Sequence, residues 1–391
     1  MNDRRRPKRL FLIIGILCIA VNLRPALSSV GPLVDFIRAE LSLSGAMLGL
    51  LTTLPLLAFG VVSMLTPIFT KRFGFGKTLL GAMALLTLGI GLRSMFDAVG
   101  LYSGTVLLGV AIAFGNVLIP ALTKQNFPEH AGVITSMYSS VMAIGAALAA
   151  GISAPLVEKF GLGWRGSLSV WAILSFIAFW VWLPQVSKIK KSQPRQGFLQ
   201  AMHRLSGKPL VWQIAVFMGL QSLAFYVILA WLPALLIDAG YDSIFSGWML
   251  SLSQATGILG SVVIPLWAGR RHDQRMIIVV LIILEFVGLI GLMFPQSPSV
   301  YLWVSLLGFV LGGAFGFALL LIVLRASDSN TAAELSGIVQ SIGYLIAATG
   351  PFVAGIIYDF SQEWNYVIAM LMALSMLKLW AGMGAGKPQT I

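Results

Sequence analysis

The chain has 391 residues, of which 58% are hydrophobic and only 10% are charged. A soluble domain carries about 25% charged residues, so this composition excludes a soluble multidomain protein and indicates an integral membrane protein. The formal net charge of +12 could suggest nucleic acid, but most basic residues stand between apolar segments, so we expect a lipid bilayer as the partner and no nucleic acid.

Twelve hydrophobic segments follow one another along the chain. Each holds about 19 or more mostly apolar residues, enough for a helix to cross a bilayer core of about 30 Å. The alternation of apolar and polar residues that marks a membrane β-barrel is absent. The sequence therefore predicts an all-α membrane protein with helices near residues 10–33, 45–69, 76–94, 99–122, 131–155, 164–184, 209–235, 245–268, 276–294, 300–324, 333–357 and 364–383.

The first segment, LFLIIGILCIAVNLRPALSSVGP from Leu10 to Pro32, carries Arg24 in otherwise apolar surroundings. Arg24 lies about 21 Å along a helix from Leu10, beyond mid-depth. A guanidinium there costs at least about 2.5–3.5 kcal/mol unless it faces protein or a water-filled cavity, and it cannot shed its proton. One interpretation is a structural arginine bound to backbone carbonyls. The other, which we favour, is a ligand-binding cation in a central cavity.

The charged residues predict the orientation of the chain in the membrane. If the N-terminus is cytoplasmic, the loops and tails on that side hold 20 of the 26 Lys and Arg residues, and the outer loops hold only Arg38, Arg93, Lys159 and Arg165. The positive-inside rule therefore places both termini in the cytoplasm. The basic stretch MNDRRRPKR before the first span lacks a following cleavage site, so we expect an uncleaved first helix. The single cysteine, Cys18, excludes an intrachain disulfide.

The longest polar stretch, Gln185 to Lys208, divides the spans six and six. An internal repeat supports this division: GVITSMYSSVMAIGAA from Gly132 resembles GIVQSIGYLIAATGP from Gly337, and LGVAIAFG from Leu108 resembles LGGAFGFA from Leu311. The repeated helices run in the same membrane sense, as in transporters built from parallel repeats. We predict a six-helix bundle over 1–184, a basic cytoplasmic linker over 185–208 and a second six-helix bundle over 209–391.

The chain resembles the cyanate and 2-nitroimidazole permease family (CynX/NimT type) of the major facilitator superfamily nearly from end to end. The sharpest part is NLRPALSSVGPL from Asn22, and further matches are LLTTLPLLAFG, GNVLIPALTKQNFP, YVILAWLPALL and SGIVQSIGYLIAATGP. The resemblance implies a bacterial inner-membrane secondary transporter with the major facilitator fold. It also implies that spans 1, 4, 7 and 10 surround a central cavity, with spans 2, 5, 8 and 11 beside them.

One loop departs from the superfamily. The loop between spans 2 and 3 usually resembles G-x-x-x-D-R-x-G-R, but here PIFTKRFGFGK has Lys71 in place of the aspartate and keeps Arg72. The corresponding loop of the second half, AGRRHDQR, keeps Asp273 and Arg275, which are the alternative candidates for a conformational latch.

Polar residues in the inner spans are the candidate ligands, because each needs a partner in apolar surroundings. Amides and phenols can hydrogen-bond a small polar solute, although an interhelical hydrogen bond is the alternative for each. We rank Arg24 first and then Gln221, Tyr226, Gln254 and Gln340 as a group. The full set is Arg24, Asn22, Asn116, Tyr138, Gln221, Tyr226, Gln254, Gln340 and Tyr344.

Three further charges could take part in transport. Lys124 ends the fourth span and either attracts an anion to the inner mouth, forms part of a gate, or is an ordinary positive-inside anchor. Glu285 lies deep in the ninth span, where it could carry a proton. Because that span should be peripheral, we favour a neutral acid or a partner for Lys378, which could otherwise snorkel to the cytoplasm.

Enzymatic motifs are absent. The sequence has no cluster with metal-ligand spacing and no phosphate loop of the G-x-x-x-x-G-K-[ST] type, so we expect no cofactor, no metal and no ATP-driven pump. We predict a monomeric secondary active transporter that moves a small anion or a nitro-bearing, drug-like compound by alternating access. The alternatives are a broad-specificity drug exporter and, in another class, a polytopic channel or sensor without a transport cycle.

Overall fold

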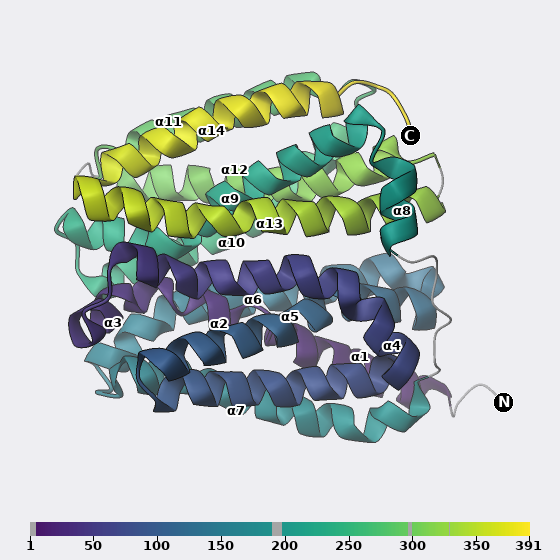
Figure 1. Cartoon of the computed structure of the whole chain (residues 1–391), viewed down its shortest axis with the longest axis horizontal. Helices are drawn as coiled ribbons and strands as arrows, with labels where there is room; N and C mark the ends of the chain where they lie inside the picture. The colour runs from purple at the N-terminus through teal and green to yellow at the C-terminus, as the bar shows by residue number, and fades with distance from the viewer. Residues whose placement is uncertain (1–4, 190–197, 296–298, 328) are drawn as a thin grey trace.

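The computed structural model describes residues 5–189, 198–295, 299–327 and 329–391. Within these ranges the regular structure is entirely helical. The long helices run along the longest axis of the molecule (Figure 1). The start of α1 and the end of α14 lie at the same side, which we call the terminal side, and the opposite side is the far side.

The described residues contain twelve helical segments that are long and apolar enough to span a membrane, which confirms the predicted spans. The elements in chain order are α1 (Arg5–Val21), α2 (Pro25–Ser28), η1 (Gly31–Leu33), α3 (Val34–Leu41), α4 (Gly45–Met95), α5 (Ala98–Asn126), η2 (Pro128–His130), α6 (Ala131–Glu158), α7 (Gly163–Trp182), η3 (Leu183–Lys188), α8 (Phe198–Leu205), α9 (Pro209–Asp238), α10 (Ser243–Gly269), α11 (Arg275–Leu292), α12 (Val300–Arg325), α13 (Ser329–Ser361) and α14 (Trp364–Ala385). Of the predicted linker 185–208, residues 190–197 lie outside the described ranges.

The second and third spans follow each other within the single element α4, with a kink between them. Gly74 interrupts this element with a positive φ of 77°, a conformation that glycine adopts without the strain that a Cβ would cause. The chain turns back there at the terminal side (Figure 1). The two spans of α4 are Gly45–Thr66 and Ile68–Met95.

The first span is broken, whereas the prediction treated 10–33 as one helix. It extends to Leu41 as α1, α2, η1 and α3. Pro25 lacks an amide hydrogen and disfavours helical geometry at the preceding residue. Accordingly α1 ends at Val21, and Arg24 has a φ of −121°. The interruption therefore places Arg24 at the junction between α1 and α2.

The two halves of the chain occupy separate parts of the molecule, the first below and the second above in Figure 1. They meet closely at the far side, where a Cβ on Gly355 of α13 would lie 2.2 Å from the Gly45 carbonyl oxygen of α4. The Asp359 carboxylate of α13 accepts hydrogen bonds from the amides of Gly45, at 2.6 Å, and Ala46, at 2.8 Å. Thr53 donates a further bond across the interface to the Ala348 carbonyl at 2.7 Å.

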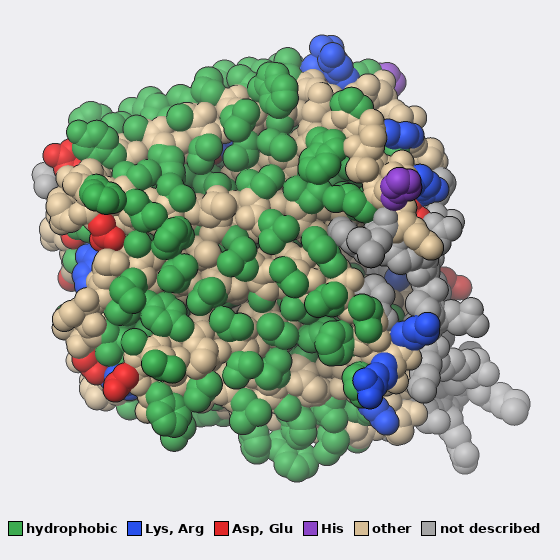
Figure 2. All heavy atoms as spheres, in the orientation of Figure 1, with side chains coloured by type: hydrophobic (Ala, Val, Ile, Leu, Met, Phe, Trp, Pro, Cys, Tyr) green, Lys and Arg blue, Asp and Glu red, His purple; other side chains and the backbone are tan. Residues whose placement is uncertain are grey.

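The surface is apolar around the middle and charged at the ends. On the face in Figure 2, hydrophobic side chains cover the central band, most Lys and Arg side chains lie at the terminal side, and the acidic side chains concentrate at the far side. One predicted outer-loop cation is placed differently. Arg93 belongs to the last turn of α4, and only 1% of it is exposed.

Candidate functional site

A cavity of about 470 Å³ lies between the two halves. The first half lines it with α5, α6 and the broken first span, and the second half lines it with α9, α10, α12 and α13. Its lining includes Asn116 and Pro120 near the end of α5, together with Thr135 and Tyr138 near the start of α6. Those helix ends lie at the terminal side, so the cavity extends toward that side, while the halves are packed together at the far side.

Arg24 reaches the cavity from the interruption of the first span. Its Nη1 donates a hydrogen bond of 3.1 Å to the Tyr226 hydroxyl of α9, which links the two halves. The guanidinium also interacts electrostatically with Tyr344 of α13. Among the described residues that line the cavity, Arg24 is the one with a formal charge, and none is Asp or Glu. A cation inside a protein cavity without a counter-ion is a strong attractor for an anionic or electron-rich group.

Four amides surround the cavity with Arg24, namely those of Asn116, Gln221, Gln254 and Gln340. Gln221 is fully buried; its Nε2 donates to Ser222 Oγ at 2.6 Å, but its Oε1 has no hydrogen-bond partner. Gln340 Nε2 donates to Ser336 Oγ at 2.7 Å. The Gln221 amide therefore keeps one unsatisfied end in a site where an unmet hydrogen bond is costly, and a solute can satisfy it.

Aromatic rings complete the lining. Tyr138, Tyr226 and Tyr344 are predicted residues, whereas Phe225 and Phe315 were not anticipated from the sequence. Phe225 and Tyr226 pack edge to face with their ring centroids 5.2 Å apart. An apolar residue that faces a cavity has the same hydropathy as one that faces lipid. In the sequence, the only indication that Phe225 lines the cavity is its neighbour Tyr226. For Phe315 the only indication is the glycine-rich motif LGGAFGFA that contains it.

Asn22 was expected beside Arg24 as a ligand, but it is not among the residues that line the cavity. Its Nδ2 donates to the Cys18 carbonyl at 2.7 Å and to the Leu174 carbonyl of α7 at 3.3 Å. The side chain thus holds the end of α1 against α7. Asn22 therefore contributes to the site by shaping the interruption between α1 and α2.

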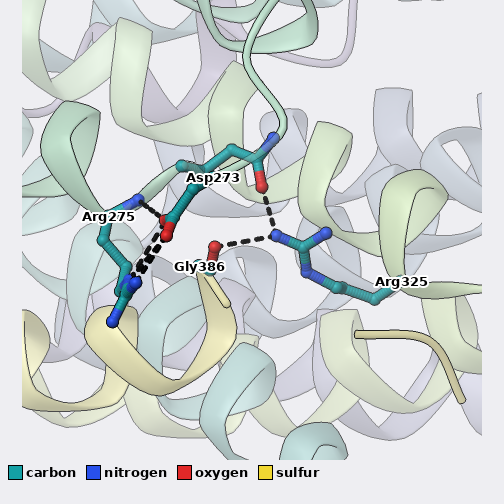
Figure 3. Close-up of polar contacts among 5 residues, drawn as sticks. Asp273, Arg275, Arg325 and Gly386 are labelled. Carbon is teal, nitrogen blue, oxygen red and sulfur yellow. Dashed lines mark hydrogen bonds and ion pairs between the residues drawn. The ribbon is translucent and has the colours of Figure 1, made fainter. Parts of the chain in front are cut away.

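The gating candidates lie at the terminal side, outside the cavity lining. Lys124 and Arg72 are exposed, and the Arg72 guanidinium lies over the Phe73 ring, 5.3 Å from its centroid. Asp273, in the loop before α11, binds Arg275, the first residue of that helix (Figure 3). The Arg275 guanidinium donates to Asp273 at 2.6 Å, and its amide donates at 2.9 Å. These bonds lower the pKa of the Asp273 carboxyl to about 2.

The same corner of the second half is tied together by Arg325, whose side chain is buried at the end of α12. It donates to the Gly386 carbonyl at 3.0 Å (Figure 3). It also donates to the Ala385 carbonyl at 2.8 Å and to the Gln274 side chain. The guanidinium therefore joins the end of α12, the loop before α11 and the end of α14. In the sequence, Arg325 is one of the 20 basic residues that the positive-inside rule assigns to the cytoplasmic side.

Glu285 of α11 and Lys378 of α14 form a buried ion pair. Only 1% of Glu285 and 2% of Lys378 are exposed, so Lys378 does not snorkel to the membrane surface. Lys378 Nζ donates to one carboxylate oxygen, and Ser375 Oγ donates to the other at 2.8 Å. Neither charged residue lines the cavity. Their charges compensate each other within the second half.

The chain is similar in sequence to known transporters. The family model described as Major Facilitator Superfamily matches residues 10–351. The chain is 39% identical to the "Uncharacterized transporter YycB" of Bacillus subtilis (strain 168), over 97% of this chain and 94% of that protein. It is 38% identical to the "2-nitroimidazole transporter" of Escherichia coli (strain K12), over 98% and 97% of the two chains. It is 26% identical to the "Cyanate transport protein CynX" of the same organism, over 94% and 96%.

Solved structures share the fold at lower sequence identity. The nucleoside transporter NupG superposes with a TM-score of 0.77 at 18% identity, over 98% of this chain and 99% of that chain. The D-xylose-proton symporter superposes with a TM-score of 0.73 at 15% identity, over 98% of both chains.

Proposed function

Because the chain belongs to the major facilitator superfamily and is an integral multi-pass membrane protein, we propose that it is a secondary active transporter of a small solute that works by alternating access. The central cavity with its one-sided closure supports this proposal. The excess of basic residues at the terminal side favours a cytoplasmic location for that side, so both termini are cytoplasmic. The conformation is then inward-facing, in a bacterial inner membrane.

The single observation that carries the proposal is the uncompensated charge of Arg24 in the cavity between the halves. A solute with an anionic or nitro group accepts hydrogen bonds from the guanidinium, and charge-assisted bonds of this kind are the strong ones. Gln221 then offers its unsatisfied amide end to a second polar atom of the solute. The rings of Phe225 and Phe315 cover the flat faces of a small planar molecule.

The Arg24–Tyr226 bond gives binding a route to the conformational change. It joins the halves at the depth of the cavity, and a solute that takes over the Arg24 donor replaces it. A ligand shifts a conformational equilibrium only by its differential affinity for the two states. The exchange of the Arg24–Tyr226 bond for a contact with the solute provides this difference in affinity.

The names of the relatives narrow the solutes worth testing. One is described as a 2-nitroimidazole transporter and another as a cyanate transport protein. Both compounds are small and carry groups that accept hydrogen bonds. We therefore propose that this chain takes a solute of that class, either a small anion or a small nitro-bearing compound.

The test is counterflow in proteoliposomes that are preloaded with 2-nitroimidazole or with cyanate. We expect saturable uptake of the labelled compound, and a loss of at least roughly tenfold in Arg24→Met, since one charge-assisted contact is worth about 1.5–3 kcal/mol. Arg271→Met, which removes an exposed guanidinium outside the cavity, is the matched control. Undiminished counterflow by a folded Arg24→Met protein contradicts the assignment of Arg24. Flux without counterflow instead indicates a channel.

A further inference from the structure

The interruption of the first span leaves a backbone carbonyl without its helical donor. In a continuous helix the Val30 amide would bind the Ala26 carbonyl, but here it binds Leu27, at 3.3 Å. Pro25 and Pro32 remove two further amide donors from the same stretch. Because all four residues of α2 are buried, a carbonyl left unpaired there destabilises this geometry.

Arg93 supplies the missing donor from another span. Its Nη1 donates to the Ala26 carbonyl at 2.7 Å. The side chain is 1% exposed, and its Nε and Nη2 have no hydrogen-bond partner. Burying a guanidinium so incompletely paired is costly. Its one bond goes to the segment that carries Arg24, two residues before Ala26.

The position of Arg93 is itself fixed by close packing. A Cβ on Gly104 of α5 would lie 2.5 Å from the Arg93 backbone nitrogen and 2.8 Å from its Cα. The backbones of α4 and α5 are therefore in direct contact at this level, which sets the direction of the Arg93 side chain. On the other flank of Arg24, Asn22 binds the Leu174 carbonyl of α7. Arg24 thus stands between two anchors, each two residues away along the chain.

We propose that Arg93 is a positioning residue that holds the interrupted first span in the geometry that directs Arg24 into the cavity. The guanidinium does not touch the solute. It stabilises the non-helical backbone through the Ala26 carbonyl and so acts through Arg24. The effect on solute affinity rests on the proposed function, whereas the effect on the backbone does not.

The first experiment measures the backbone directly by cysteine alkylation. In a Cys18→Ser background, which removes the only native cysteine, Ser28→Cys reports on α2 and Ser139→Cys on α6. Both positions line the cavity, but Ser28 is 1% exposed whereas Ser139 is exposed, so N-ethylmaleimide should modify position 28 slowly. We expect Arg93→Met to accelerate modification at position 28 by roughly tenfold, as the loss of one buried hydrogen bond implies. Arg93→Lys, which keeps a donor, should largely restore the slow rate.

The rate at position 139 is the internal control and should stay within about twofold, since Arg93 makes no hydrogen bond to α6. An unchanged rate at position 28 in folded Arg93→Met protein overturns the proposal, and so does an equal acceleration at both positions. Should Arg93→Met fail to fold, Gly104→Ala replaces it, because the added Cβ displaces the backbone of residue 93. The same selective acceleration is then expected, and its absence has the same meaning.

The second experiment separates positioning from general stability. In 2-nitroimidazole counterflow, Arg93→Met should raise KM by roughly tenfold with a smaller change in the maximal rate, and Arg93→Lys should recover most of the affinity. A fall in the maximal rate at constant KM contradicts a role through Arg24. If the unmodified protein shows no counterflow with this compound, the proposed substrate fails, and the alkylation rates still decide the role of Arg93.

Discussion

The contact of Asp359 with the start of α4 predicts how the far side is held closed. The carboxylate belongs to the second half, and the two amides that it binds, those of Gly45 and Ala46, begin a helix of the first half. It therefore satisfies two amide donors that have no partner inside the helix, and it lies at the positive end of the helix dipole. The halves cannot separate at the far side without breaking both bonds.

The size of the effect follows from these two bonds. A hydrogen bond to a charged group contributes about 1.5–3 kcal/mol, and a carboxylate at a helix N-terminus about 0.3–1 kcal/mol. Asp359 is partly exposed, and Asn in its place keeps one acceptor, so we expect Asp359→Asn to weaken the closed far side by about 1–2 kcal/mol. That corresponds to a shift of about 5–30-fold toward the conformation that is open at the far side.

The assay is a distance measurement between spin labels on the two halves at the far side. Suitable positions are Phe160, which is 71% exposed between α6 and α7, and Asn365, which is exposed at the start of α14. In a background without Cys18, Asp359→Asn should increase the long-distance population in double electron–electron resonance. Asp97→Asn is the matched control, because the Asp97 carboxylate pairs with Arg165 inside the first half. An unchanged distribution in Asp359→Asn, or an equal shift in the control, refutes the reasoning.

Three further predictions concern the second half. Glu285→Gln and Lys378→Met each leave one buried partner unpaired, so each should lower the free energy of unfolding by about 3–5 kcal/mol and lower the melting temperature. The double variant should recover part of this loss. If the two losses simply add in the double variant, the residues are not a coupled pair. Arg275 lowers the pKa of Asp273 to about 2, so the stability that this carboxylate contributes is present above its ordinary pKa and is lost as the pH falls through about 2. Asp273→Asn should therefore leave the pH dependence of the melting temperature between pH 5 and 8 unchanged. A new transition in that pH range would show that the loop adopts another state, in which Asp273 is not paired as it is here. Arg325→Ala removes the guanidinium that binds the end of α14 and should lower the free energy of unfolding by about 1–3 kcal/mol. Proteolysis after α14 should become faster, and an unchanged cleavage rate would contradict this role of Arg325.

Hydropathy predicted the spans well because lipid imposes length and apolarity on each helix separately. The same reasoning predicted most of the polar residues that line the cavity. Gln254 and Asn116 line it because an amide in a membrane helix must face protein or water. Asn22 met the same demand through backbone carbonyls of α1 and α7. Residue type therefore predicted that a polar group would be satisfied inside the protein, but not by which partner.

The interruption of the first span depends on tertiary contacts that a single segment does not reveal. Pro25 is visible in the sequence, yet Pro120 and Pro233 lie inside the continuous helices α5 and α9. A proline frees backbone groups, and whether the helix then opens depends on what satisfies them. At the first span the Arg93 guanidinium binds the Ala26 carbonyl, whereas the sequence predicted Arg93 only as an outer-loop cation.

The break is also a departure from the internal symmetry of the chain. In a six-plus-six arrangement the counterpart of the first span is the seventh, α9, which runs as one helix from Pro209 to Asp238 and carries Tyr226. The fold therefore does not require an irregular backbone at this position, since one half forms the same layer with a regular helix. Local departures of this kind are expected at functional sites, where they persist only if the surroundings hold them. The asymmetry puts a guanidinium on the first half and a phenol hydroxyl on the second. The Arg24–Tyr226 hydrogen bond between the halves therefore has a donor that a solute anion can bind and an acceptor that the anion can displace.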